Sequence, residues 1–138
     1  MVKKKAIVRK MWVKAPSKPV KPALSELEKK ATEARCIALI ERMKPVWIQP
    51  PHERWGYVSD VYGKWYGNYY SFCALYRYDA PEATRPQAEM KFSRLEYVGP
   101  GKYNLAYFRH TGQWFQVFEA LSLDDCLEQL EKNAIFQP

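Results

Sequence analysis

Three apolar segments late in the chain are separated by turns so short that the segments must be neighbouring antiparallel strands. We predict strands over 92–98, 103–109 and 114–118, joined by Gly99-Pro100-Gly101 and by His110-Thr111-Gly112. Parallel neighbours need a crossover connection of roughly a dozen residues or more, which turns of this length do not supply. The sequence therefore predicts an antiparallel meander. Two further strands are expected before it, over 57–62 and 69–78, with a turn region between Gly63 and Gly67.

A helix is predicted before the strands. Ser25 can cap its start, Glu28 can complete a capping box, and Pro45 should end it after Lys44. The helical spacing of the apolar residues predicts which face is buried. That face is expected to carry Leu27, Ala31, Ala34, Ile37, Ala38 and Ile40.

A second helix is predicted after the strands, capped by Ser122 with support from Asp125. Its apolar stripe is expected at Leu123, Cys126, Leu127 and Leu130, and Ile135 and Phe136 are expected to pack back onto the domain. The predicted fold is α+β: a four- or five-stranded antiparallel meander covered by an N-terminal and a C-terminal helix, preceded by an extended basic tail.

The excess positive charge lies entirely in the first 22 residues. This stretch has eight Lys and Arg and no acid, whereas the remainder has 14 Lys and Arg against 15 Asp and Glu. We therefore divide the chain into a tail, residues 1–22, and a single domain, residues 23–138. In the tail, Pro16, Pro19 and Pro22 recur every third residue, the period of a polyproline II helix.

Polyanions are the commonest partners of such a basic segment. The tail cations could neutralise nucleic-acid phosphates while Trp12 stacks on a base. Alternatively, the prolines could dock in an SH3-like groove, or the apolar residues could rest on an anionic membrane surface. A solvated segment without any partner is the remaining alternative.

Aromatic residues make up 15% of the chain, and several stand beside cations. Lys64-Trp65-Tyr66 is followed closely by Tyr69 and Tyr70, and Arg94 and Arg109 fall in predicted strands among aromatic neighbours. A sheet that displays rings among cations can stack unpaired bases and bind phosphates. In the competing interpretation the rings point inward, and the arginines stack on them or pair with Glu89 and Glu96. The candidate nucleic-acid-binding residues are Lys3, Lys4, Lys5, Arg9, Lys10, Trp12, Lys14, Lys18, Lys21, Lys64, Trp65, Tyr66, Arg94 and Arg109.

Catalytic and metal-binding signatures are weak. The chain has two histidines and no phosphate-binding loop, dinucleotide fingerprint or zinc-ligand spacing, so we expect neither a cofactor nor a metal ion. Cys36, Cys73 and Cys126 are expected to be buried free thiols of a cytoplasmic protein. No apolar run is long enough to span a bilayer.

These features predict a non-enzymatic protein that binds nucleic acid, with RNA favoured over DNA, alone or as a subunit of a larger assembly. The alternative is a protein–protein adaptor or homodimer that uses an exposed aromatic patch. The weakest alternative is a small enzyme whose site contains His110 and Glu96.

Overall fold

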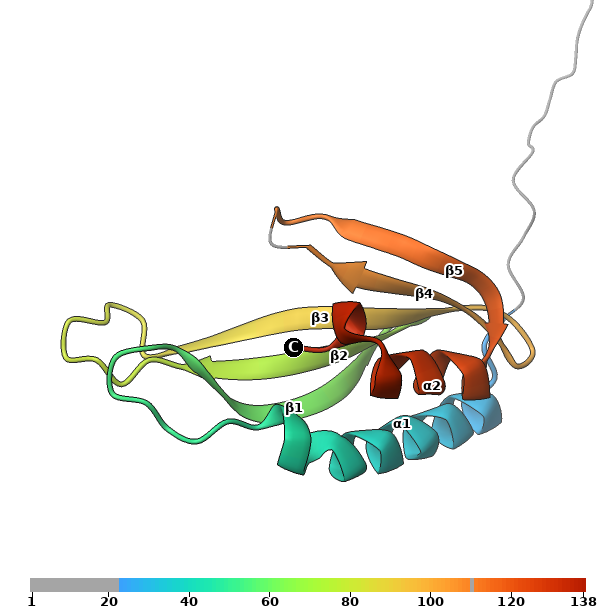
Figure 1. Ribbon diagram of the computed structural model, residues 1–138. Coiled ribbons are helices and arrows are strands. Elements are labelled where there is room, and N and C mark those ends of the chain that lie inside the picture. Colours follow the sequence, from blue (N-terminus) through green and yellow to red (C-terminus); the bar gives the residue numbers. More distant parts are fainter. Residues whose placement is uncertain (1–22, 110) are drawn as a thin grey trace, which may run out of the picture.

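The computed structural model describes residues 23–109 and 111–138. Five strands form one sheet in the order β1-β2-β3-β4-β5, with each neighbouring pair antiparallel, and two helices flank them in sequence (Figure 1). The predicted α+β meander with an N-terminal and a C-terminal helix is thereby confirmed. The elements are α1 (Glu26–Trp47), β1 (Tyr57–Tyr66), β2 (Tyr69–Arg77), β3 (Gln87–Gly99), β4 (Lys102–Phe108), β5 (Trp114–Ser122), α2 (Leu123–Lys132) and the 3-10 turn η1 (Ala134–Phe136).

Both helices lie on the same side of the sheet (Figure 1). Helix α1 contacts β1 and packs beside α2, which in turn contacts β4 and β5. We call this side the helix face. Within residues 23–109 and 111–138, no helix covers the opposite side of the sheet, which we call the open face.

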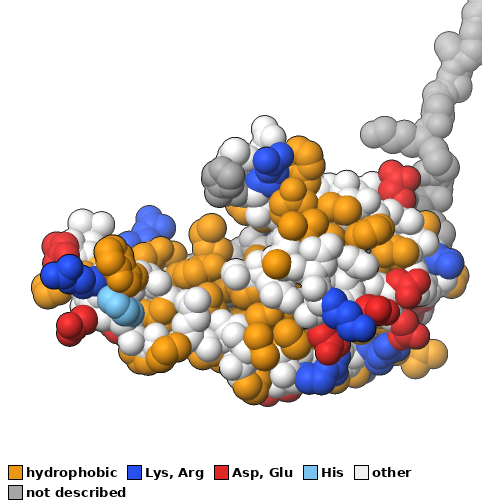
Figure 2. Space-filling model, viewed as in Figure 1, with side chains coloured by type: hydrophobic (Ala, Val, Ile, Leu, Met, Phe, Trp, Pro, Cys, Tyr) orange, Lys and Arg blue, Asp and Glu red, His pale blue; other side chains and the backbone are white. Residues whose placement is uncertain are grey.

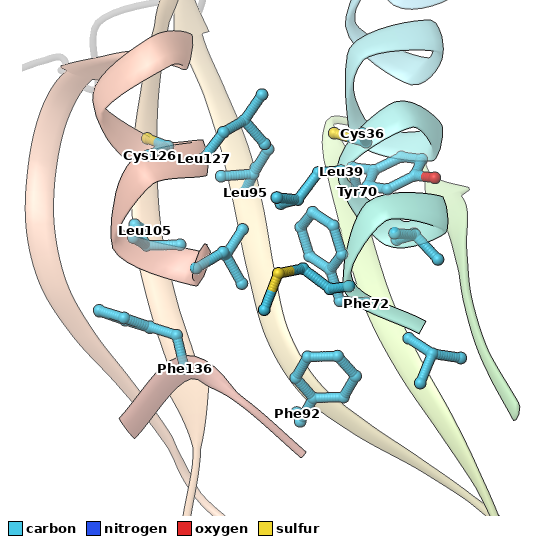
Figure 3. Packing of buried hydrophobic residues seen from close by; sticks show 14 of the residues in the cluster. Cys36, Leu39, Tyr70, Phe72, Phe92, Leu95, Leu105, Cys126, Leu127 and Phe136 are labelled. Atoms are coloured by element: carbon cyan, nitrogen blue, oxygen red, sulfur yellow. The ribbon is translucent and has the colours of Figure 1, made fainter. Parts of the chain in front are cut away.

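The hydrophobic core fills the space between the helices and the helix face (Figure 3). Tyr70, Phe72, Leu95, Leu105 and Phe136 are each 0% exposed, and they come from strands β2, β3 and β4 and from η1. Burying a side chain of this size stabilises a fold by about 1.5–3 kcal/mol relative to leaving it in water. The core therefore fixes which face of every strand points toward the helices.

The ends of α1 differ from the prediction. The backbone N–H of Glu28 donates to the Ser25 hydroxyl at 3.1 Å, so the predicted cap is present. The Glu28 carboxylate, however, accepts from the backbone of Gly101 at 2.9 Å and so ties the helix to the β3–β4 turn. The helix also continues through Pro45 to Trp47. Trp47 is buried in the core, and this packing offsets the one backbone hydrogen bond that proline removes from the last turn.

The predicted buried face of α1 was wrong apart from Ile40. Leu27 is 82% exposed, and the alanines at 31, 34 and 38 also face water. Alanine buries little surface, so the face that meets the sheet is decided by the larger side chains, which lie about one residue further along the helix than the alanines. The buried positions are Thr32, Cys36, Leu39, Ile40, Met43 and Trp47.

Strand β1 runs through the turn predicted after residue 62 and ends only at Tyr66. Gly63 is paired opposite Phe72, and the ring of Tyr70 occupies the position where a side chain at residue 63 would begin. The glycine therefore accommodates a cross-strand ring and does not form a turn. Strand β3 also begins earlier than predicted, at Gln87, because its first half pairs with β2.

The C-terminal part agrees with the prediction except at Ile135 and in β5, which was predicted to end at Phe118 and runs to Ser122. The Ser122 hydroxyl accepts from the backbone N–H of Asp125 at 3.1 Å, and the predicted stripe of α2 is buried or half-buried. Phe136 is fully buried, and its carbonyl accepts from the Ser93 hydroxyl at 2.6 Å. Ile135 differs, since 47% of it is exposed. The end of the chain thus closes one side of the core.

Candidate nucleic-acid interface

The pairing register assigns each strand residue to a face, because directly paired residues point to the same side of a sheet. Lys64 pairs with Ser71, Ser71 with Arg94, and Arg94 with Ala106. The flanking residues Trp65 and Tyr70 belong to the core, so this row lies on the open face. By the same register the open face carries Tyr62, Lys64, Tyr66, Tyr69, Lys91, Arg94 and Trp114, together with Glu89 and Glu96.

Arg94 is stacked between two aromatic rings of the open face. Its guanidinium carbon lies 4.4 Å from the ring centroid of Tyr69 on β2 and 4.3 Å from that of Trp114 on β5. The residues paired with Arg94, Ser71 and Ala106, are small, so the rings of Tyr69 and Trp114 can reach over them to the guanidinium. A cation above an aromatic ring is stabilised by the ring quadrupole, and two rings hold the guanidinium in one orientation.

A second cluster lies at the end of the β1–β2 hairpin. Tyr66, which is 49% exposed, has the ammonium of Lys91 at 4.2 Å and that of Lys64 at 5.5 Å from its ring centroid. Tyr66 pairs directly with Tyr69, so this cluster adjoins the Arg94 stack. Cations and rings therefore alternate across strands β1, β2, β3 and β5.

Glu89 partly neutralises this surface. Its carboxylate accepts from Lys64 at 2.9 Å and from the hydroxyl of Tyr62. The Tyr62 hydrogen bond, followed by that of Lys64, lowers the pKa of Glu89 below its usual 4.5. The hydrogen bond to Glu89 in turn raises the pKa of Lys64, so Lys64 stays charged at neutral pH. Among the residues described, no ion pair includes Lys91 or Arg94.

The structure brings three of the sequence-predicted body residues together and separates two. Lys64, Tyr66 and Arg94 share the open face, as the register requires. Trp65 points to the helix face, where its ring packs 5.2 Å from that of Tyr70. Arg109 follows β4, and its guanidinium carbon lies 4.5 Å from the ring centroid of Phe115, away from the Arg94 stack. The tail candidates lie outside the described residues: Lys3, Lys4, Lys5, Arg9, Lys10, Trp12, Lys14, Lys18 and Lys21.

Sequence reasoning missed Tyr69, Lys91 and Trp114 as members of this surface. Tyr69 could have been found, because a two-residue turn at Gly67-Asn68 places it opposite Tyr66. Trp114 could not, since its contact with Arg94 reaches across β4 and depends on how far the sheet twists. Lys91 could not have been found either, because a register shift in the β2–β3 pairing decides that it lies on the open face.

The remaining candidate chemistry does not form a second site in the described part of the chain. His110 lies outside it, and the Glu96 carboxylate accepts from the Asn104 side chain at 3.2 Å. The Nδ1 atom of His52 accepts two backbone N–H groups at 3.0 and 3.1 Å, which is a turn-stabilising role. No three His, Cys, Asp or Glu side chains within residues 23–109 and 111–138 are placed to hold a metal ion.

The cysteines are buried free thiols, as predicted. Burial raises the pKa of Cys73 to about 11 and that of Cys126 to about 12, so both thiols are neutral and unreactive at physiological pH. Burial also raises the pKa of Cys36. None of the helices described is long and apolar enough to cross a membrane.

The outer surface of the helices differs from the open face. Lys and Arg alternate there with Asp and Glu over α1 and α2 (Figure 2). Arg35 pairs with Asp124, and Arg42 pairs with Glu131 at 3.0 Å. Exposed ion pairs of this kind contribute at most about 1 kcal/mol each. Over the two helices, eight Asp and Glu stand against six Lys and Arg. The helix side is therefore a solvated surface of mixed charge.

No curated protein and no solved structure matches the chain. A family model described as "Domain of unknown function (DUF3024)" matches residues 24–138. The match begins at the N-terminal end of α1 and includes the whole sheet, both helices and η1. Because this is most of the sequence, the chain belongs to the DUF3024 family.

Proposed function

We propose that this protein is a non-enzymatic nucleic-acid-binding protein, with RNA favoured over DNA, whose open face contacts the ligand. The observation that carries the proposal is the alternation of Lys64, Lys91 and Arg94 with the rings of Tyr66, Tyr69 and Trp114 on one uncovered side of the sheet. Single-strand binders combine the same two elements: cations that contact the backbone and rings on which bases stack.

The tail supports the same function from the sequence. Its eight Lys and Arg residues, with no acid among them, would displace the counterions condensed on a nucleic acid. Such contacts do not depend on base sequence, so the tail would supply affinity and the open face would supply selectivity. We place this function in the cytoplasm, because unpaired buried thiols such as those of Cys36, Cys73 and Cys126 are typical of a reducing compartment.

Fluorescence anisotropy with labelled single- and double-stranded RNA and DNA tests the proposal across a salt series. The full-length chain is compared with a chain that begins at Ala23. If all eight tail cations contact a single strand, truncation should reduce the slope of log K against log salt by about 5 to 6. Failure of the full-length protein to bind any of these probes at low salt would refute the proposed function.

One observation favours a second candidate function, self-association through the outer edge of β5. Phe115 and Val117 are each 42% exposed, and residues 113–118 contain no charge. Edge strands of monomeric proteins are usually protected by charges, prolines or bulges. Strand β5 is bulged at Val117 and again before Leu121, but its uncharged apolar stretch is of the kind that pairs with other chains. A concentration-dependent mass by light scattering, abolished by Val117→Lys and retained by Val46→Lys at another exposed position, would support this candidate.

A further inference from the structure

We propose that the guanidinium of Arg94 is a phosphate-binding subsite that makes the open face selective for single-stranded over double-stranded nucleic acid. This inference rests on the proposed function and assigns its selectivity to one side chain.

Both rings are in cation–π contact with the planar guanidinium of Arg94. The ring centroid of Tyr69 lies 4.4 Å from the guanidinium carbon and that of Trp114 lies 4.3 Å from it. The N–H donors of arginine lie in that plane, where they form a fork that fits two oxygens of one phosphate. None of the ion pairs between described residues uses this fork.

The sheet holds this fork in place before any ligand binds. Arg94 stands on β3, the middle strand, and its side chain is half-buried between the two rings. Its paired neighbours are the small residues Ser71 and Ala106, of which 3% and 5% are exposed. Because the side chain is already ordered, binding a phosphate loses less conformational entropy than it would at a free surface arginine.

The same surroundings favour unpaired bases. Tyr66, Tyr69 and Trp114 provide rings on both sides of Arg94, within a few strand spacings of about 5 Å each. A single strand can place a phosphate on the guanidinium while its neighbouring bases stack on these rings. A duplex keeps its bases stacked inside, so none of them can stack on these rings, and it gains little from this surface. The tail cations attract both forms, so apart from stacking by Trp12 the preference for a single strand comes from the rings of the open face.

The test uses the full-length protein, a fluorescent oligouridylate and a duplex RNA of equal length. Arg94→Lys keeps the positive charge but removes the planar fork and its stacking. We expect it to weaken oligouridylate binding by about ten-fold or more while leaving duplex binding within about two-fold. Trp114→Leu should have the same selective effect. The matched controls, Arg85→Lys and Trp55→Leu, change exposed residues of distant loops and should alter neither affinity.

The salt dependence separates charge from geometry. For oligouridylate, Arg94→Ala should reduce the slope of log K against log salt by about 0.7. Arg94→Lys should leave this slope unchanged, because the charge is kept, although the affinity falls. Thermal unfolding of each variant checks that it remains folded. If Arg94→Ala does not fold, Trp114→Leu still tests the subsite independently.

Three outcomes decide between the proposals. Selective loss of oligouridylate binding in Arg94→Lys and Trp114→Leu supports the subsite. Binding of both probes that is equal in strength and unaffected by these substitutions overturns the subsite, but it leaves nucleic-acid binding by the tail standing. Absence of binding to either probe at low salt overturns the subsite and the proposed function together.

Discussion

Replacing Gly63 with alanine would place a methyl group against the ring of Tyr70. An ideal Cβ at residue 63 lies 2.2 Å from the Tyr70 hydroxyl oxygen and 2.4 Å from both Cε2 and Cζ of the ring. Ordinary van der Waals contacts to a Cβ begin at 3.4 Å, so the ring would have to move by about 1 Å. The ring has little room to do so, because it is 0% exposed and its centroid lies 5.2 Å from those of both Trp65 and Phe72.

The expected cost follows from two opposing effects. Inserting a methyl group into a well-packed core destabilises a protein by about 1–3 kcal/mol, and the fully enclosed ring places Gly63→Ala at about 3 kcal/mol. Alanine recovers about 0.5–1 kcal/mol of this, because glycine in a strand loses more backbone entropy on folding. The net loss is about 2 kcal/mol, which lowers the Tm of a domain of this size by about 8 °C.

Thermal and urea unfolding of Gly63→Ala, followed by tryptophan fluorescence and circular dichroism, would measure this loss. Gly99→Ala is the matched control, since nothing lies within 4 Å of its added Cβ. Gly56→Ala should fall between them, because it meets Tyr78, a ring that is 41% exposed and can turn away. If Gly63→Ala proves no less stable than Gly99→Ala, the packing of Tyr70 over Gly63 is wrong.

Three other substitutions test separate contacts. Thr32→Val removes the buried 2.6 Å hydrogen bond to Tyr103 and should cost about 1–2 kcal/mol in urea unfolding. Ala120→Gly should stabilise the protein by about 0.5–1 kcal/mol, because Ala120 has a φ of 51°, a left-handed conformation that costs non-glycine residues about 1–2 kcal/mol. Glu89→Gln should reduce stability at neutral pH but not in acid. The Tyr62 hydrogen bond lowers the folded-state pKa of Glu89 below 4.5. The carboxylate therefore stabilises the fold above pH 4.5, and this stabilisation is lost as the pH falls through the lowered pKa. Urea unfolding across a pH series would show whether the difference between the two proteins disappears in acid.

The fold was predictable where local signals were strong. The short turns after residues 98 and 109 required antiparallel neighbours, and Ser122 marked the start of α2. The buried face of α1 was not predictable from spacing, because its alanines and its larger residues follow the same helical period. Only contact with the sheet selects the stripe that contains Cys36 and Met43.

The candidate site was predictable in part for a related reason. Alternation along β1 separates Lys64 and Tyr66 from Trp65, and a continuous strand through Gly63 would have shown this. The Arg94 stack, in contrast, joins β2, β3 and β5 and depends on the register shifts and twist of the sheet. Contacts between side chains on non-adjacent strands leave no signature in a single sequence.

The closure of the core by α2 and Phe136 has a consequence for biosynthesis. Every strand pairs with a strand adjacent to it in sequence, so each hairpin can form as soon as its second strand leaves the ribosome. The apolar face of β4 and β5, however, is covered by α2 and η1, which are made after the sheet. A nascent chain whose five strands have emerged while α2 has not therefore holds a complete sheet, on which α1 covers the β1 side and the apolar face of β4 and β5 is bare. During that interval the bare face is exposed to chaperones and to aggregation, until α2 and η1 emerge and cover it.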